Sequence, residues 1–313
     1  MLGKTAAGLY WMCRYLERIE YTTRLLEAAF RIALTNSNDA KSEWGSIILT
    51  TGNKASYLDL YDEYESTRVI NFLLREKSNP SSVLSVIETA RNNARIVRTA
   101  LTRESWEAIN ECWLELNNSL RRPITENALP QVLSGIRKQN ALVRAALDGT
   151  MLRNDIYNFL RLGTFIERAD STARILDVKY YVLLPSLSQV GSSIDFVQWE
   201  SILRSVSALR AYWWLHGNQI SSKQIANFLI LDERMSRSLT FCLQKINNNL
   251  FYLSQTYQRE FSCRTLADTM FKRLQHVSID KILLDGLHEY LITFLSNSEA
   301  LNKEIETNFG FYG

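Results

Sequence analysis

The sequence predicts an all-α fold, an elongated helical bundle made of two pseudo-symmetric tandem repeats. Two observations predict helices. The chain has 313 residues but only 12 Gly and 4 Pro, and between these helix breakers apolar residues recur three, four and seven positions apart. A third observation predicts the repeats, because the segment at residues 10–27 recurs 150 positions later at residues 160–177.

Matching positions of the two segments carry the same or similar side chains. The pairs are Glu17 and Glu167, Arg18 and Arg168, Glu20 and Asp170, Thr22 and Thr172, Arg24 and Arg174, Leu26 and Leu176, and Glu27 and Asp177. The match continues with Trp44 and Trp199, then with Asn71 and Asn227. We therefore predict a first repeat over residues 1–150 and a second over residues 151–313, packed as one structural unit because no Pro/Gly/Ser-rich linker separates them.

Two side-chain seams run along the first of these segments if it is helical. One is apolar, and its counterpart near residue 166 is apolar too. The other places Tyr10, Arg14, Glu17, Tyr21 and Arg24 at alternating steps of four and three. Our hypothesis is a buried carboxylate–guanidinium network, against the alternative of solvated pairs within each helix. The network would comprise Arg14, Glu17, Arg18, Arg24, Glu167, Arg168, Asp170 and Arg174.

The first repeat is predicted to contain a long helix followed by shorter ones. Ser82 and Thr102 are expected to be N-caps, and Pro130 is expected to open a helix. The expected helices cover residues 4–35, the segment from Ser42 to Gly52, Val69–Leu74, the segment from Ser82 to about Leu101, the segment from Thr102 to Arg121, and residues 130–149.

The second repeat is predicted to follow the same order. Its long helix covers Arg153–Leu184 and stops at Pro185, and Asp195 with Gln198 resembles a capping box. Later helices are expected at Ser238–Arg259, Thr265–Gln275 and Ile279–Phe309.

Composition limits the partners and the compartment. A formal net charge of +3 is too small to predict nucleic-acid binding, and no apolar run is long enough for a membrane helix. The four cysteines, Cys13, Cys112, Cys242 and Cys263, are far apart and form no CxxC pair. We expect them to be reduced and to pack in the core, which predicts a cytoplasmic protein.

The sequence offers little for catalysis, metals or cofactors. None of the histidines, His216, His276 and His288, has a local arrangement with a Ser or Cys nucleophile. Glycine-rich phosphate loops are absent from the sequence. Glu17-x-x-Glu20 and Glu167-x-x-Asp170 supply carboxylates but no histidine, and the adjacent arginines disfavour a cation. We expect no metal and no cofactor.

Arg91, Arg95 and Arg98 lie at i, i+4 and i+7, so a helix would place three cations on one face. This face could bind an anionic ligand or an acidic partner. The alternative is pairing with the protein's own acids, such as Glu88 or the run at residues 62–65. In the second repeat Asp232 and Arg237 flank the matching turn and are expected to form a clamp.

The sequence resembles a bacterial family, the alpha-E domain proteins, an all-α family with Glu-Arg (ER) motifs. The resemblance covers nearly the whole chain. It rests on Leu9-Tyr-Trp11, Arg14-Tyr-Leu-Glu-Arg18, Asn79-Pro-Ser-Ser82, Ala90-Arg-Asn-Asn-Ala-Arg95, Trp106, Phe165-Ile-Glu-Arg-Ala-Asp170, Phe228-Leu-Ile-Leu-Asp232 and Arg237-Ser238. One departure is Met235-Ser236, where the family pattern leads us to expect a proline.

The resemblance implies partners that the residues alone do not. Similar proteins are encoded beside, or fused to, circularly permuted ATP-grasp proteins and transglutaminase-like proteases, in predicted peptide-ligation or peptide-modification systems. The implied role is a non-catalytic accessory protein that acts with an ATP-grasp peptide ligase or amidoligase. The alternative is an enzyme with a Glu/Arg-lined pocket between the two repeats, using Glu17 or Glu167 as acid or base.

Overall fold

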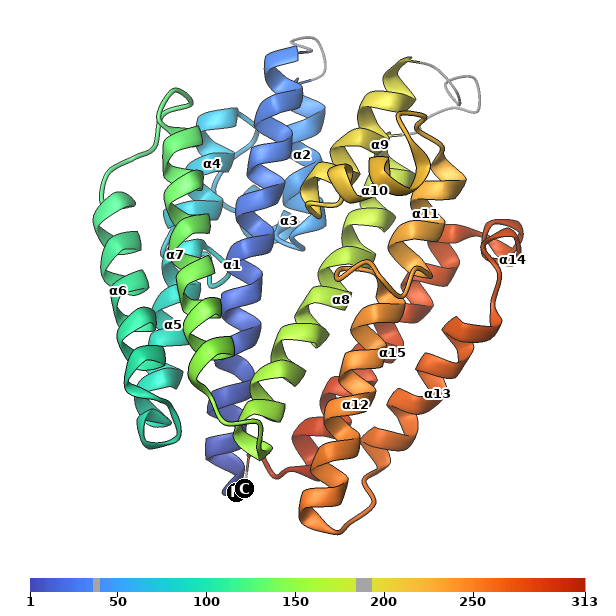
Figure 1. Ribbon diagram of the computed structural model, residues 1–313. Helices are drawn as coiled ribbons and strands as arrows, with labels where there is room; N and C mark the ends of the chain where they lie inside the picture. Colours follow the sequence, from blue (N-terminus) through green and yellow to red (C-terminus); the bar gives the residue numbers. More distant parts are fainter. Residues whose placement is uncertain (36–39, 184–192, 313) are drawn as a thin grey trace. The chain divides into compact units, whose positions relative to one another are not determined.

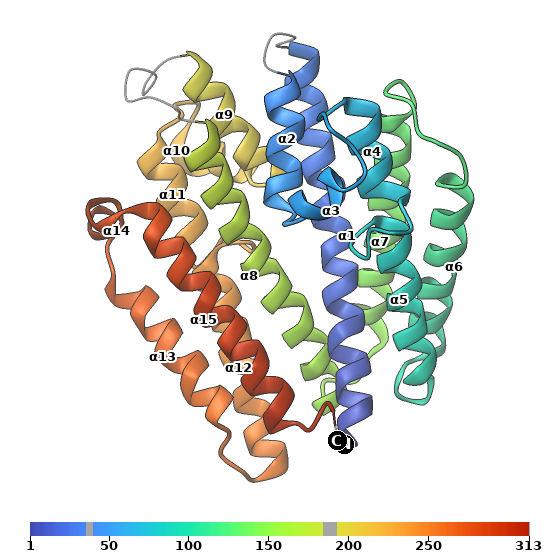
Figure 2. The ribbon, with the colours of Figure 1, turned by 180° about the vertical axis from the view of Figure 1, so that it is seen from behind.

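The computed structural model describes residues 1–35, 40–183 and 193–312, and every regular element in those ranges is a helix (Figure 1, Figure 2). The predicted all-α class is confirmed. The chain divides into two compact units, Met1–Thr164 (unit 1) and Phe165–Gly313 (unit 2). This division falls inside a helix, whereas the sequence comparison places the repeat boundary between residues 150 and 151. The repeat relation and the packing of the repeats as one structural unit stay predictions.

Unit 1 is organised around its first helix. That helix packs against α2, α5 and α7, and α6 packs against both α5 and α7; α1, α5, α6 and α7 run side by side (Figure 1). The elements are α1 (Gly3–Thr35), α2 (Ala40–Thr50), α3 (Lys54–Leu58), α4 (Ser66–Arg75), α5 (Val83–Ile96), the 3₁₀ helix η1 (Arg98–Ala100), α6 (Arg103–Ser119), α7 (Leu129–Thr150) and the start of α8 (Asp155–Leu183).

The apolar seams predicted for the two long helices are buried. On α1 and α8 the residues at steps of three and four are almost fully excluded from solvent, as expected for a helix that packs on its neighbours through one stripe. They are Leu9, Met12, Leu16, Ile19, Thr23 and Leu26 on α1, and Phe159, Leu162, Ile166, Ala169, Ala173 and Leu176 on α8. Phe30, the last predicted member of the seam on α1, is only half-buried.

Two predicted N-caps of unit 1 are confirmed. The hydroxyl oxygen of Ser82 accepts the backbone N–H of Ser85, and that of Thr102 accepts the backbone N–H of Ser105. One boundary differs, because α5 ends at Ile96 and the chain continues as η1 instead of extending to Leu101. Arg98 therefore leaves the helix that carries Arg91 and Arg95.

Unit 2 contains the remainder of α8 and seven further helices among the described residues. α13 packs against α12 and α15, and α14 packs against α11 and α15. The elements are α9 (Ser193–Ser205), α10 (Leu209–His216), α11 (Ser222–Ile230), α12 (Leu239–Tyr257), α13 (Ser262–His276), α14 (Ile279–Asp285) and α15 (Leu287–Asn308).

Two predictions for unit 2 are wrong. The expected helix Ile279–Phe309 is broken at Gly286, whose φ of 103° lies in the left-handed region that favours glycine. The expected cap Asp195 lies inside α9, which begins at Ser193. The predicted stop at Pro185 falls outside the described residues.

None of the helices in the described ranges combines the length and the apolar composition that a membrane crossing requires.

Candidate functional site

The most buried charge of the first Glu-Arg segment is Glu20, which is fully excluded from solvent. Its carboxylate forms an ion pair with Arg24, one turn later on α1, and a second with Arg144 Nη2 of α7 at 3.5 Å. Asn140 Nδ2 of α7 donates to Glu20 Oε2 at 3.0 Å. Unit 1 therefore contains a carboxylate–guanidinium cluster around a buried glutamate. Of its members only Arg24 belongs to the hypothesised network, whereas Glu20, Asn140 and Arg144 were not named in it.

Of the other predicted members on α1, Glu17 is buried, whereas Arg14 and Arg18 are only half-buried. Glu17 is only 3% exposed. The guanidinium carbon of Arg14 lies 4.6 Å from the ring centroid of Trp11, and that of Arg18 lies 5.6 Å from the ring centroid of Tyr15. These are cation–π distances, so aromatic residues of the same helix help to position both arginines.

In unit 2 the Glu-Arg segment of α8 holds a turn. Glu167 and Arg168 are buried. Arg168 Nη1 donates to the Ser236 carbonyl oxygen at 3.3 Å, and the hydroxyl of Thr172 donates to the Arg237 carbonyl oxygen at 2.9 Å. The turn at residues 232–238, where the family pattern predicted a proline, is thus fixed by side chains of α8.

The pair of Asp170 and Arg174 departs from the predicted buried network. Arg174 Nε lies 2.7 Å from Asp170 Oδ2, one turn apart on α8, and the two side chains are 22% (Asp170) and 44% (Arg174) exposed. An exposed pair of this kind contributes about 0.3–0.5 kcal/mol. At this position of the second segment, the alternative of a solvated pair within one helix is correct.

Asp232, which was expected to form a clamp with Arg237, pairs with Arg234 instead. Asp232 binds Arg234, whose Nη2 lies 2.8 Å from Asp232 Oδ2 and whose backbone N–H also donates to Asp232. The hydrogen bond from the Arg234 side chain holds the pKa of Asp232 below its usual value. Arg237 contributes its backbone carbonyl, which accepts from Thr172.

Two of the three arginines near the end of α5 lie over tryptophan rings of α6. The guanidinium carbon of Arg91 lies 3.9 Å from the Trp113 ring centroid, and Arg91 Nε donates to Asn110 Oδ1 at 2.8 Å. Trp113 Nε1 in turn donates to Glu88 at 2.5 Å. Arg98, on η1, lies 5.4 Å from the Trp106 ring centroid, and Arg95 is exposed.

We call the set of Arg91, Arg95, Arg98, Trp106 and Trp113 the Arg–Trp surface. Among the described residues no ion pair joins these arginines to the expected acids: Glu65 of the acidic run at residues 62–65 binds Arg68, and Glu88 accepts a hydrogen bond from Trp113. Trp106 and Trp113 are functional candidates that the sequence reasoning missed. Their spacing of seven residues on α6, matching that of Arg91 and Arg98, was the available signal.

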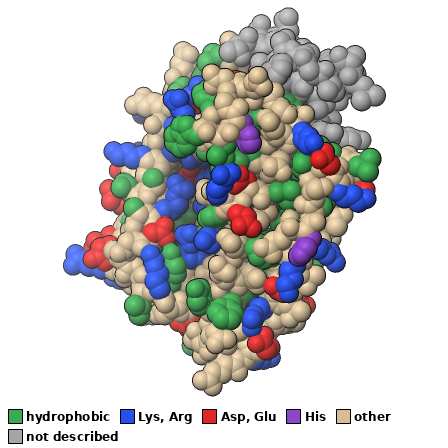
Figure 3. Space-filling view, turned by 45° about the vertical axis from the view of Figure 1, so that its right-hand side comes forward, with side chains coloured by type: hydrophobic (Ala, Val, Ile, Leu, Met, Phe, Trp, Pro, Cys, Tyr) green, Lys and Arg blue, Asp and Glu red, His purple; other side chains and the backbone are tan. Residues whose placement is uncertain are grey.

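Surface charge elsewhere is mixed. On the face drawn in Figure 3, Lys and Arg side chains lie among Asp and Glu side chains. A groove of about 490 Å³ between α12 and α13 shows the same mixture, since Glu260 pairs with Arg264 at 2.9 Å and Asp268 with Lys272 at 2.7 Å. The Lys272 contact holds the pKa of Asp268 below its usual value.

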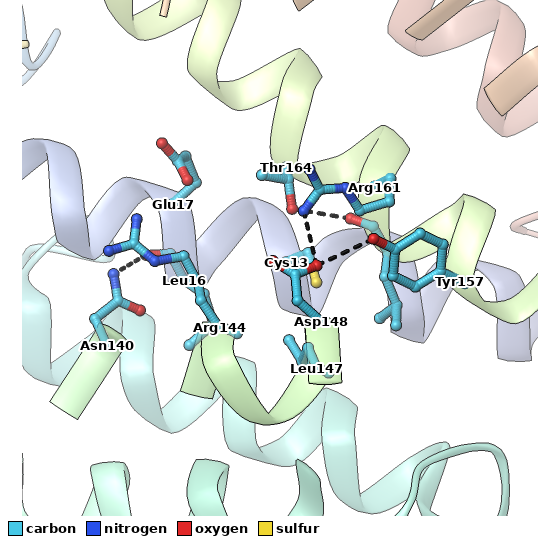
Figure 4. Close-up of a pocket in the computed structure, with 11 residues that line it drawn as sticks. Cys13, Leu16, Glu17, Asn140, Arg144, Leu147, Asp148, Tyr157, Arg161 and Thr164 are labelled. Atoms are coloured by element: carbon cyan, nitrogen blue, oxygen red, sulfur yellow. Dashed lines mark hydrogen bonds and ion pairs between the residues drawn. The ribbon is translucent and has the colours of Figure 1, made fainter. Parts of the chain in front are cut away.

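A small cavity lies within unit 1, among α1, α7 and α8, and Glu17 and Asn140 both line it (Figure 4). Its volume of about 30 Å³ is room for roughly one or two water molecules, far below the roughly 300 Å³ of a typical ligand pocket. We call it the Asn140 cavity. Its complete lining is Cys13, Leu16, Glu17, Asn140, Arg144, Leu147, Asp148, Tyr157, Leu160, Arg161 and Thr164.

The cysteines do not offer a reactive thiolate. All four are buried and none forms a disulfide, and burial raises the pKa of Cys13, Cys112 and Cys263 to about 12, so these three thiols are protonated at neutral pH. Among the described residues, no three His, Cys, Asp or Glu side chains are grouped as metal ligands would be. His288 Nδ1 contacts Asp177 Oδ1 at 2.5 Å, linking α15 to α8.

Comparison with known proteins places this architecture in a family. A family model named Alpha-E, described as a predicted alpha-helical domain with a conserved ER motif, matches residues 1–309. Neither the curated proteins nor the solved structures provide a match. Because the family model covers nearly the whole chain and describes the helical fold observed, the chain belongs to the Alpha-E family.

Proposed function

We propose that this protein is a non-catalytic helical accessory subunit of a circularly permuted ATP-grasp ligase, in a cytoplasmic system that synthesises or modifies peptides. A transglutaminase-like protease is a second proposed partner. The observation that carries the proposal is the Arg–Trp surface, on which Arg91 and Arg98 lie over tryptophan rings and Arg95 is exposed. In this proposal the buried Glu-Arg clusters serve the fold, and the Arg–Trp surface contacts the partner.

Fixed cations suit recognition of an acidic surface. Arg91 is held by stacking on Trp113 and by its hydrogen bond to Asn110, so little side-chain freedom remains to be lost on binding. Its guanidinium can still donate in the paired geometry that matches a carboxylate. Glu88 is the acid that contacts this surface, through Trp113. The three arginines therefore outnumber it and favour an acidic partner.

We expect charge reversal of the exposed arginines to weaken binding of the ATP-grasp protein. The double variant Arg95→Glu with Arg98→Glu should raise the dissociation constant by about tenfold or more, because like charges placed face to face across an interface cost several kcal/mol. Calorimetric titration of the purified ATP-grasp protein measures this effect. Added salt should weaken binding by the native chain more than by the variant.

A second double variant controls for net charge. Arg122→Glu with Lys138→Glu reverses two exposed cations of unit 1 that lie on neither α5 nor η1, and it changes the net charge by the same amount. It should bind as the native chain does. Equal affinities of the native chain and both double variants would contradict docking through the Arg–Trp surface.

The alternative function is an enzyme that uses Glu17 or Glu167 as acid or base, and the burial of both glutamates favours it. The size of the Asn140 cavity counts against a substrate reaching Glu17 by that route. The rate of the ligase, measured with and without this protein, decides between the two functions. If the protein is an accessory subunit, its folded Glu17→Gln and Glu167→Gln variants should still stimulate the ligase. If the protein is an enzyme, these variants should lose its own reaction.

A further inference from the structure

The side-chain amide of Asn140 is held in one orientation. Its Nδ2 donates to the Leu16 carbonyl oxygen at 3.1 Å and to Glu20 Oε2 at 3.0 Å. Both partners accept hydrogen bonds, so the amide nitrogen must face them, and a flipped amide would place oxygen against oxygen. The position of Asn140 Oδ1 on the other side of the amide is therefore fixed.

Asn140 Oδ1 is a buried acceptor that needs a donor. The residue is only 1% exposed, and none of the described residues donates a hydrogen bond to this oxygen. Buried side-chain polar atoms in folded proteins nearly always have a hydrogen-bond partner, supplied by the protein or by a bound molecule.

The Asn140 cavity provides the room, and further polar side chains line it. Its volume of about 30 Å³ exceeds the roughly 10–15 Å³ that one water molecule needs. Glu17 lines the same cavity, and a carboxylate has about four acceptor positions, so it can accept a further hydrogen bond beside its protein contacts. Figure 4 shows Asn140 at one end of this cavity and the Tyr157, Asp148 and Arg161 cluster at the other.

Charge decides which kind of donor fits. Among the lining residues Glu17 and Asp148 are balanced by Arg144 and Arg161, and Glu20, which contacts Arg144, is paired with Arg24. The cluster within unit 1 is therefore neutral overall. A cation entering it would lose its hydration without gaining a net negative charge, so a neutral donor is favoured.

We propose that the Asn140 cavity is a binding site for a neutral hydrogen-bond donor of one or two non-hydrogen atoms, which donates to Asn140 Oδ1 and to the Glu17 carboxylate. The donor is either a resident internal water or the hydroxyl or amide end of a small ligand that replaces it. The site is independent of the docking proposed above, and it brings a bound molecule into contact with a glutamate of the Glu-Arg segment.

Magnetic relaxation dispersion of water, which detects long-lived internal waters, tests the site. Cys13 lines the cavity, and Cys13→Leu puts a larger apolar side chain into it. We expect this variant to lose one long-lived water relative to the native protein. Cys112→Leu makes the same change at a buried cysteine of α6 that does not line the cavity, and it should keep the native number.

A crystal structure of the native protein gives a reading that does not depend on any variant. We expect electron density within hydrogen-bond distance of Asn140 Oδ1. An empty cavity, or an Asn140 Oδ1 that accepts from another protein group, would overturn the proposal. An unchanged number of long-lived waters in a folded Cys13→Leu variant would overturn it as well.

Small probes distinguish the two sources of the donor. Formamide and methanol are neutral donors, and methylammonium is a cation of similar size. If the neutral probes displace the water and shift the NMR signals of the Asn140 side-chain amide, the site accepts a ligand. If no probe displaces the water, the resident water is the donor, and the proposal stands. Displacement by methylammonium alone would refute the neutral class.

Discussion

Replacing Glu20 by alanine should lower the free energy of unfolding by about 3–5 kcal/mol, the usual cost of removing one partner of a buried ion pair. The carboxylate is fully buried, and its loss leaves Arg24 and Arg144 without the charge that compensates them. These two arginine side chains are 18% and 33% exposed. Water can therefore reach them in part, which favours the lower end of that range. Urea unfolding followed by tryptophan fluorescence measures the change.

Asp170→Ala is the matched control, because Asp170 occupies the corresponding position of the second segment. Its pair with Arg174 is reached by water, with Asp170 22% and Arg174 44% exposed, so we expect a loss below about 1 kcal/mol. Two variants that remove corresponding acids should thus differ severalfold in their effect. Equal losses would show that burial does not set the strength of these pairs.

The contrast between Glu20 and Asp170 also shows where sequence reasoning reaches its limit. The recurrence of Glu17 as Glu167 in the repeated segment led to the hypothesis that both are buried, and both are. The sequence could not predict that Glu20 meets α7, since Asn140 lies 120 residues away along the chain. Similar residues at corresponding positions therefore experience different surroundings.

Local chemistry predicted boundaries best where a side chain defines them. Ser82 and Thr102 could be identified as caps because each hydroxyl oxygen accepts a backbone N–H three residues later. Gly286 was missed because a single glycine inside a helical pattern is often tolerated. Only the backbone shows the positive φ that separates α14 from α15.

For the functional candidates Arg91, Arg95 and Arg98 too, the sequence predicted the local arrangement and not the neighbouring helix. The sequence placed Arg91, Arg95 and Arg98 on one helix face and left open what would contact them. For Arg91 and Arg98 the structure supplies the answer from α6, where each arginine lies over a tryptophan ring. Spacing within one helix says which residues share a face, and it does not say which helix lies opposite.

Among Gly→Ala substitutions in unit 1, we expect Gly163→Ala to lower the free energy of unfolding most. A Cβ at Gly163 of α8 would overlap the carbonyl oxygen of Tyr10 on α1 and would lie 2.9 Å from its carbonyl carbon. The obstacle is backbone inside a helix, so the two helices must move apart. Overpacking typically costs about 1–3 kcal/mol, and we expect a value at or above the upper end, measured as the change in the free energy of unfolding.

A Gly→Ala substitution at a position with free space should instead raise the free energy of unfolding. Gly135 lies within α7, and a Cβ there would meet no atom within 4 Å, so Gly135→Ala should stabilise the protein by roughly 0.5–1 kcal/mol through higher helix propensity. Because propensity favours alanine at both positions, a loss at Gly163 must come from the contact with Tyr10. A stabilising Gly163→Ala would mean that α1 and α8 do not approach this closely in solution.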